Sequence, residues 1–302
     1  MRNRFIQDLV KKAEADSRIV LVVGDLGYGV VEPFSDRFPA RFFNAGVAEQ
    51  NMMGLAAGLS SEGYHVFVYS IANFPIFRCA EQIRNDVCYH QLNVTVVAVG
   101  GGLSYGNLGY SHHAVQDYAF MRTLPHLKIL SPGDPNEVSN CLDYIFNNPS
   151  PSYLRLGKAG EKDFSRQSAR LEPGIFNIIR QVKNAKRAVI ATGAILQNVM
   201  AFYNNGEDVD FDILTCPIWG MAEKGEVENQ LSQYSRVVTI EDHLLEAGFG
   251  SWVMEAMTPS SREKLRIIGL LNNVCGMVGS QQSMQELGGI SKNQIDRYLN
   301  EK

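Results

Sequence analysis

The sequence predicts an α/β protein with two domains, each a mostly parallel sheet with helices on both faces. Its 302 residues are about two domain lengths. Short β-branched runs alternate with amphipathic stretches along the chain, which is typical of parallel sheets covered by helices. This alternation stops once, in a polar and charged stretch that follows residue 157. We therefore expect a first domain at 1–160, a linker at 161–174 and a second domain at 175–302.

The first domain begins with apolar residues at helical spacing from Phe5 to Ala15, and a buried strand, Ile19–Val23, follows. The elements that we expect next are a helix at about 48–60, a strand at 65–69, a helix at about 76–90, a strand at 94–99, a glycine-rich loop at 100–109, a short helix near 114–121, a strand at 128–130, a helix opening at 134–135 and a strand at 152–156.

The same alternation resumes after the linker. We expect strands at 188–192, 211–214, 237–241 and 265–269, and helices at 195–203 and 251–257. Ser291 is a typical N-cap for a last helix. The pattern therefore predicts a second sheet of the same class.

Composition excludes several classes of function. The formal net charge is −4, and no tract concentrates basic residues, so we expect no nucleic-acid partner. The first residues lack a signal-peptide core, and no apolar run is long enough to span a membrane, which predicts a cytoplasmic protein. Five scattered cysteines without a C-x-x-C pair indicate buried thiols rather than disulfides or zinc.

The segment 42–59 places one acid, Glu49, in an apolar helix rich in glycine and alanine. A carboxylate in the first turn of a helix is favoured by the helix dipole, so Glu49 could serve only as a capping residue. Residues 42–61 contain no Lys or Arg that could pair with it. A buried, unpaired carboxyl favours its protonated form, which suits proton transfer. Both interpretations stay open on the residues alone.

Residues 45–74, AGVAEQNMMGLAAGLSSEGYHVFVYSIANF, resemble the pyrimidine-binding domain of transketolases. The resemblance implies that Glu49 is the catalytic acid, which protonates the pyrimidine ring of thiamine diphosphate. It also implies that Ile71, Phe74 and Phe77 form the pocket around that ring, with Phe74 stacking on it. Spacing alone would place these three residues in an ordinary core.

The glycine-rich loop extends the resemblance. Gly109-Tyr110-Ser111-His112 is similar to the Gly-Pro-Thr-His motif of the family, which implies that His112 contacts cofactor and substrate, with His113 beside it. On the residues alone, the pair could equally be surface histidines. Lys158 stands where the family carries a phosphate-binding Arg, and lysine keeps the charge without the bidentate fork.

Three other positions depart from the family pattern. Leu108, Gly100 and Gly29 stand where sugar-phosphate transketolases usually carry an Asp, a His and a Ser that contact substrate. The resemblance therefore implies ketol transfer from a ketose to an aldehyde that is not a standard pentose phosphate. In the second domain, the segment 239–251 resembles the strand-to-helix turn of the family's C-terminal domain, for which we expect no catalytic role.

The diphosphate half of the cofactor site is missing from this sequence. Gly24-Asp25-Leu26-Gly27 lacks the second Gly of the Gly-Asp-Gly motif of thiamine enzymes, and Asn44 follows Asp25 by only 19 residues, so we interpret the segment as a strand-ending turn. The resemblance implies a separately encoded diphosphate-binding partner, which binds Mg²⁺ or Ca²⁺, and a heterotetramer.

Other functions stay open. The alternatives are the β subunit of a 2-oxo acid dehydrogenase first component, a synthase that condenses pyruvate with an aldehyde, and a non-catalytic assembly subunit.

Overall fold

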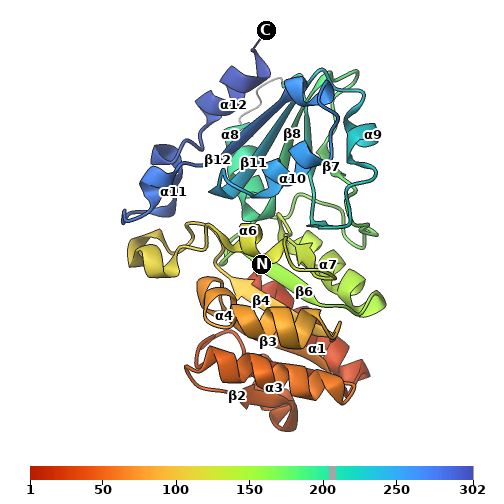
Figure 1. Cartoon of the computed structure of the whole chain (residues 1–302), viewed down its shortest axis with the longest axis vertical. Coiled ribbons are helices and arrows are strands. Elements are labelled where there is room, and N and C mark those ends of the chain that lie inside the picture. The colour runs from red at the N-terminus through yellow and green to blue at the C-terminus, as the bar shows by residue number, and fades with distance from the viewer. Residues whose placement is uncertain (204–208, 302) are drawn as a thin grey trace.

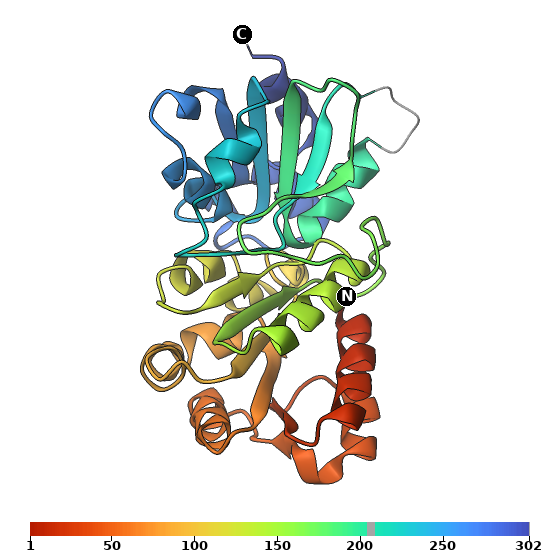
Figure 2. The same ribbon diagram turned by 90° about the vertical axis from the view of Figure 1, so that its right-hand side faces the viewer.

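The computed structural model describes residues 1–203 and 209–301, which form two sheets stacked along the long axis of the molecule (Figures 1 and 2). The first has seven strands in the order β10-β5-β6-β4-β3-β1-β2, and the second has five in the order β12-β11-β8-β9-β7. All strand pairs are parallel except β10 with β5 and β7 with β9. The predicted α/β class, with two mostly parallel sheets, is confirmed.

The strands of the first sheet are β1 (Ile19–Val23), β2 (Phe42–Asn44), β3 (His65–Ile71), β4 (Val94–Val99), β5 (Lys128–Leu130), β6 (Ser152–Leu156) and β10 (Ile218–Gly220). Those of the second are β7 (Asn177–Arg180), β8 (Arg187–Thr192), β9 (Asp212–Thr215), β11 (Arg236–Leu244) and β12 (Leu265–Leu270).

The α-helices are α1 (Arg2–Ala15), α2 (Glu32–Arg37), α3 (Glu49–Ser61), α4 (Asn73–Phe77), α5 (Ala80–Gln82), α6 (Asp117–Met121), α7 (Pro135–Asn147), α8 (Leu196–Phe202), α9 (Val227–Leu231), α10 (Phe249–Glu255), α11 (Gln281–Leu287) and α12 (Lys292–Leu299). The Ser291 side chain accepts a hydrogen bond from the Gln294 N–H, so the predicted cap of the last helix is confirmed.

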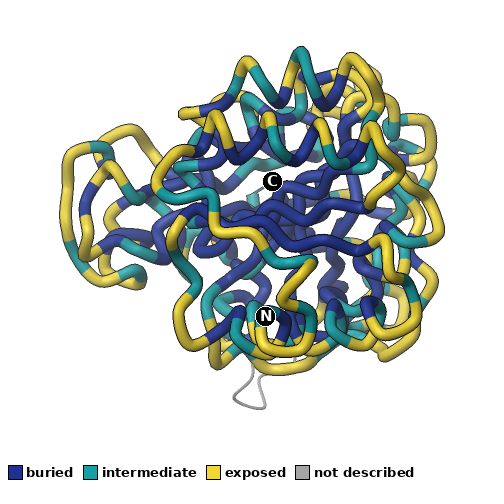
Figure 3. The backbone as a smooth tube through the Cα atoms, turned by 90° about the horizontal axis from the view of Figure 1, so that it is seen from below, coloured by how far each residue is buried: buried dark blue, intermediate teal, exposed yellow. Residues whose placement is uncertain are grey.

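Strand periodicity explains why both faces of the first sheet are covered. Successive side chains point to opposite faces, and β1 is buried along its whole length. Ile19, Leu21 and Val23 belong to an apolar cluster that includes residues of α1, α2 and α7, while Val20 and Val22 belong to a second cluster that includes residues of α3 and α6. Figure 3 shows the result, with buried strands in the centre and exposed residues around them.

The predicted helix at 76–90 is wrong as a single element. The chain forms α4, then α5, then a π-helical segment at Ile83–Cys88. Cys79 interrupts the first two at φ −129°, outside the helical region. Local apolar spacing did not reveal this break, because the spacing continues across it.

Strand β10 belongs to the first sheet although it lies beyond the predicted linker in the sequence. It pairs with β5 and forms the outer strand of that sheet. Strands β2, β7 and β10 were absent from the sequence-based expectations, as were α2, α9 and α11. Most are too short to carry a readable period. The bounds 1–160, 161–174 and 175–302 stay a prediction, and β10 qualifies any division of the chain at the linker.

Within residues 1–203 and 209–301, we find no helix that is long and apolar enough to cross a bilayer.

Candidate active site

The sequence-predicted site residues gather at one edge of the first sheet, where its parallel strands end. Glu49 opens α3 soon after β2, α4 follows β3, the histidine loop follows β4, and Lys158 follows β6. Carboxyl ends of parallel strands meet at one edge, where α/β proteins commonly bind ligands. The loop after β4 projects at the same side of the molecule as α11 (Figure 1), and Gly106 hydrogen bonds to Gly279 ahead of that helix.

Glu49 is buried, with 4% of its surface exposed, and its Oε1 accepts a 2.6 Å hydrogen bond from Arg78 Nη1. The expectation that this carboxyl lacks a cationic partner is therefore wrong. The partner comes from the end of α4, across the sheet edge rather than from the helix that carries Glu49. Sequence reasoning missed Arg78, although it is the first Lys or Arg after Glu49 along the chain.

Phe74 lies between two polar side chains. The Arg78 guanidinium carbon is 4.3 Å from the centre of the Phe74 ring, and the His112 ring is 5.2 Å away in an edge-on arrangement. Ile71, at the end of β3, is half-buried, whereas Phe77 is 46% exposed at the end of α4. Phe74 is therefore the member of the predicted pocket that directly contacts the polar groups.

The two adjacent histidines have different surroundings. His112 is half-buried beside Phe74, and the Ser111 hydroxyl lies 3.0 Å from its Nδ1. Burial lowers the pKa of His112, as do His113 and Arg78 nearby. His113 is 1% exposed, its Nε2 lies 3.3 Å from the Gly106 carbonyl oxygen, and its Nδ1 has no hydrogen-bond partner among the described residues. His112 therefore faces the site, and His113 packs beneath the loop.

Lys158 joins the site through Tyr105. Its Nζ lies 4.2 Å from the centre of the Tyr105 ring, and that ring is 6.4 Å from His112. Burial lowers the pKa of Lys158, as does nearby Arg2. A side chain at Gly100, which has φ +76°, would collide with Tyr105. The aromatic ring therefore explains why the chain carries glycine where the family pattern has histidine.

A pocket of about 260 Å³ opens beside Lys158, between the two sheets. Polar side chains from both halves of the chain line it, among them Ser104, Lys158, Glu161, Gln197 and Gln281. The pocket therefore lies next to Lys158, the lysine that the sequence predicted to bind substrate.

The segment 24–27 forms a turn at the end of β1, and Asp25 adopts φ +55°. Asn44 locks this turn, because its Nδ2 donates to Asp25 Oδ1 and its Oδ1 accepts from the Asp25 N–H, both at 3.0 Å. The Tyr28 hydroxyl donates to the same carboxylate oxygen at 2.8 Å. Asp25 and Asn44 therefore bond to each other within the chain.

The arrangement fits the pyrimidine half of thiamine diphosphate. That ring needs an aromatic or apolar face and a carboxyl at its edge, and Phe74 and buried Glu49 supply them. Among the described residues, we find no group of three His, Cys, Asp or Glu side chains placed to hold a metal ion.

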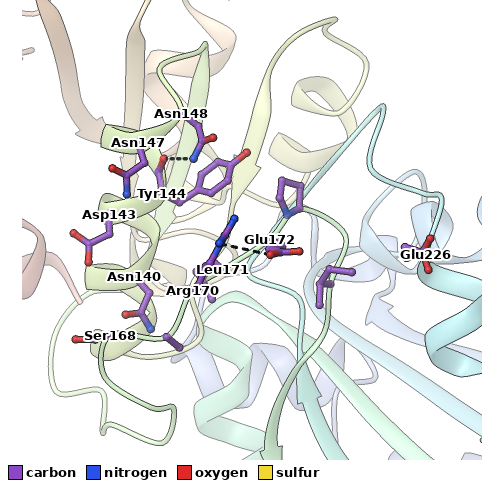
Figure 4. A pocket seen from close by; sticks show the side chains of 13 residues that line it. Asn140, Asp143, Tyr144, Asn147, Asn148, Ser168, Arg170, Leu171, Glu172 and Glu226 are labelled. Atoms are coloured by element: carbon purple, nitrogen blue, oxygen red, sulfur yellow. Dashed lines mark hydrogen bonds and ion pairs between the residues drawn. The ribbon is translucent and has the colours of Figure 1, made fainter.

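A pocket of about 820 Å³ lies elsewhere, between α7 and the segment 168–175 (Figure 4). Polar and apolar residues line it, and Asn140, Asp143 and Asn147 lie along α7. It contains none of the predicted site residues.

Comparisons with known proteins identify the family of the chain. Residues 1–160 match the family model "Transketolase, pyrimidine binding domain". The chain is 27% identical over 299 residues to an apulose-4-phosphate transketolase subunit of Actinobacillus succinogenes, covering 98% of this chain and 96% of that protein. It is 32% identical over 307 residues to the putative transketolase C-terminal section of Methanocaldococcus jannaschii, covering 100% and 95%.

Among solved structures, the chain is similar to a split-gene transketolase described as an inactive β4 tetramer. The two are 28% identical and superpose with a TM-score of 0.81, covering 99% of this chain and 96% of that one. The similarity therefore extends across both sheets.

Proposed function

Since the chain belongs to the transketolase family, as a subunit of the split type, we propose that it forms one half of a thiamine diphosphate-dependent enzyme that transfers a two-carbon ketol unit from a ketose to an aldehyde. Its part is to supply the carboxyl, aromatic and histidine groups that surround the pyrimidine ring.

One observation carries this proposal. Glu49 is a buried carboxyl beside the carboxyl ends of the first sheet's strands, its partner Arg78 lies over the ring of Phe74, and that ring contacts the ring of His112. A solvated capping glutamate would not be almost fully buried or require an arginine from another element. The alternative of a mere helix cap is therefore disfavoured.

The proposed roles follow from these contacts. Bound thiamine diphosphate supplies the electron sink for breaking and forming the carbon–carbon bond. Glu49 holds a proton at its carboxyl oxygen, and burial excludes the water that would compete for it. Phe74 orients a flat ring by its face. His112, held at Nδ1 by Ser111, presents its Nε2 toward substrate hydroxyl groups.

A separate subunit would complete the site. One relative is named as a transketolase subunit and another as a C-terminal section, which suggests a second chain, and the solved split relative is inactive as a β4 tetramer. The described residues offer no metal cluster. We propose that a diphosphate-binding partner brings Mg²⁺ or Ca²⁺ and that two copies of each chain assemble.

The substrate belongs to the proposal as well. Tyr105 fills the space next to Gly100, Leu108 is 50% exposed and Lys158 lines the pocket of about 260 Å³. These features favour an aldehyde other than a standard pentose phosphate. The name of the Actinobacillus relative suggests the ketose apulose 4-phosphate and similar ketoses as a first class of donor to test.

The test is reconstitution with the proposed diphosphate-binding partner chain. We expect thiamine diphosphate-dependent ketol transfer by the mixture and none by either chain alone, with Glu49→Gln inactive. Transfer between xylulose 5-phosphate and ribose 5-phosphate at ordinary rates would remove the substrate part of the proposal only. Acylation of lipoamide from a 2-oxo acid, or condensation of pyruvate with an aldehyde, would replace ketol transfer. Full activity of the Glu49→Gln mixture would leave the chain as an assembly subunit.

A further inference from the structure

The Glu49–Arg78 pair places a flat cation on an aromatic face and against a buried carboxylate. Arg78 Nη1 donates to Glu49 Oε1 at 2.6 Å, and the guanidinium carbon lies 4.3 Å from the centre of the Phe74 ring. These are the two groups that the proposed pyrimidine site would use. The arginine therefore makes the contacts with Glu49 and Phe74 that a bound pyrimidine ring would need.

The two partners differ in how firmly they are held. The Glu49 side chain is 4% exposed, whereas that of Arg78 is 47% exposed. Arg78 directly follows α4, before the break at Cys79. A half-exposed arginine gains hydration when its ion pair opens, but a buried carboxylate left alone loses solvation. If the pair opens, Arg78 is the partner that moves, and something polar must replace it at Glu49.

The pair is also incompatible with the proposed chemistry. Glu49 Oε1 already accepts a hydrogen bond from Arg78 Nη1, and the guanidinium already lies on the Phe74 ring, so neither group is available to a bound ring. An aminopyrimidine is flat like a guanidinium, and it also offers nitrogen atoms at its edge to a carboxyl group. Both groups cannot occupy the same face of Phe74 and the same oxygen of Glu49.

We propose that Arg78 is a latch. In the free subunit it holds Glu49 as a paired carboxylate and covers Phe74, and the pyrimidine ring of the cofactor must displace it before Glu49 can act as an acid. This inference rests on the proposed function. It makes Arg78 a positioning residue whose closed form protects the buried carboxylate until the cofactor arrives.

Only molecules whose latch is open can bind the ring. The apparent association constant is therefore the intrinsic constant multiplied by the fraction of open molecules. The test uses the full chain and, as a probe, 4-amino-5-hydroxymethyl-2-methylpyrimidine, which is the pyrimidine half of thiamine. Binding is followed by NMR of arginine side chains and histidine rings, which also detects weak affinity. The variants are Arg78→Gln, Glu49→Gln and, as the matched control, Arg84→Gln, which removes an exposed arginine that contacts Asn85.

We expect Arg78→Gln to bind the probe about tenfold more tightly than the unaltered chain. In the unaltered chain, the probe should shift the Arg78 side-chain signal toward that of a solvated arginine. Arg84→Gln should behave like the unaltered chain. Because the Arg78 charge contributes to lowering the pKa of His112, that pKa should rise in Arg78→Gln.

The other possible results contradict either the latch or the proposed function. Equal or weaker binding by Arg78→Gln, with loss of binding by Glu49→Gln, overturns the latch and leaves the proposed function standing. Unchanged binding by Glu49→Gln contradicts the proposed function itself. Failure of the unaltered chain and of Arg78→Gln to bind the probe overturns the latch, because opening it would then reveal no ring site. Melting temperatures of the four proteins identify any variant that fails to fold.

Discussion

Two regions of this molecule hold ionisable groups out of water, and they do so in opposite ways. At the junction between the sheets, Arg155 of β6 donates to Asp117 and to the backbone carbonyl oxygens of Ala114 and Asp242, and it lies over the ring of Tyr118. All of these groups are buried. At the sheet edge, buried Glu49 has a single, half-exposed arginine.

The difference separates structural from functional polar groups. At the junction, burial raises the pKa of Glu241 to about 8 and that of Glu137 to about 7. Yet Glu241 accepts hydrogen bonds from the Phe249 and Gly250 N–H groups, and so caps α10. A shifted pKa alone would point to the wrong region. Glu49 indicates the site better, because it is a buried acid whose single arginine partner is half-exposed.

The largest effect that we predict is on stability, at the junction. Arg155→Ala should lower the free energy of unfolding by about 3–5 kcal/mol, because it leaves the Asp117 carboxylate buried with only its Tyr153 bond. Urea denaturation measures this. Lys12→Ala, which breaks the exposed pair with Asp143, is the control and should cost at most about 1 kcal/mol. Similar costs for both would remove the distinction between the regions.

At the sheet edge we predict the reverse pattern. Glu49→Gln should lower kcat of the reconstituted enzyme by about 10²–10⁴-fold, the usual contribution of a positioned acid or base. Because Gln keeps the size of the side chain and Arg78 can turn into solvent, the free energy of unfolding should change by less than about 1 kcal/mol. A large loss of stability with little loss of kcat would assign Glu49 to structure instead.

The sequence allowed much of the first sheet's edge to be predicted and little of the junction. Glu49, Phe74 and His112 lie in a recognisable pattern, and the edge follows from the order of parallel strands. Arg78 escaped because its contact with Glu49 joins two elements 29 residues apart. The junction escaped for the same reason, since Arg155 reaches the carbonyl of Asp242 across 87 residues. Periodicity describes one element at a time and cannot reveal which elements meet.

The junction should also impose a pH dependence on stability. Glu137 and Glu241 have raised pKa values in the folded state, so the fold binds more protons than the unfolded chain, and stability falls as pH rises through about 7 and 8. His65 and His243, whose pKa burial lowers to about 4, act oppositely, but only up to about pH 6.5. From pH 6.5 to 8 the free energy of unfolding should therefore fall by about 2 kcal/mol.

Urea denaturation at several pH values tests this, with Glu241→Gln as the informative variant. Gln resembles the protonated acid, so the decline should become shallower. A decline of unchanged steepness would mean that Glu241 is already ionised in the fold, held by its two backbone N–H groups.

The smallest effect that we predict concerns the two adjacent histidines. We expect His112 to contribute to activity and His113 to contribute to stability. His112→Asn should lower kcat/KM of the reconstituted enzyme by about tenfold, because the ring faces Phe74 and the site, and it should leave unfolding nearly unchanged. His113→Asn should instead destabilise the chain by about 1–3 kcal/mol, because His113 is 1% exposed and bonded to Gly106. Steady-state kinetics and urea denaturation of both variants separate the roles. His113→Asn could instead lower kcat/KM more than His112→Asn does, at equal stability. The active site would then include the buried side chain of His113 beneath the loop, and burial would no longer separate catalytic from structural residues.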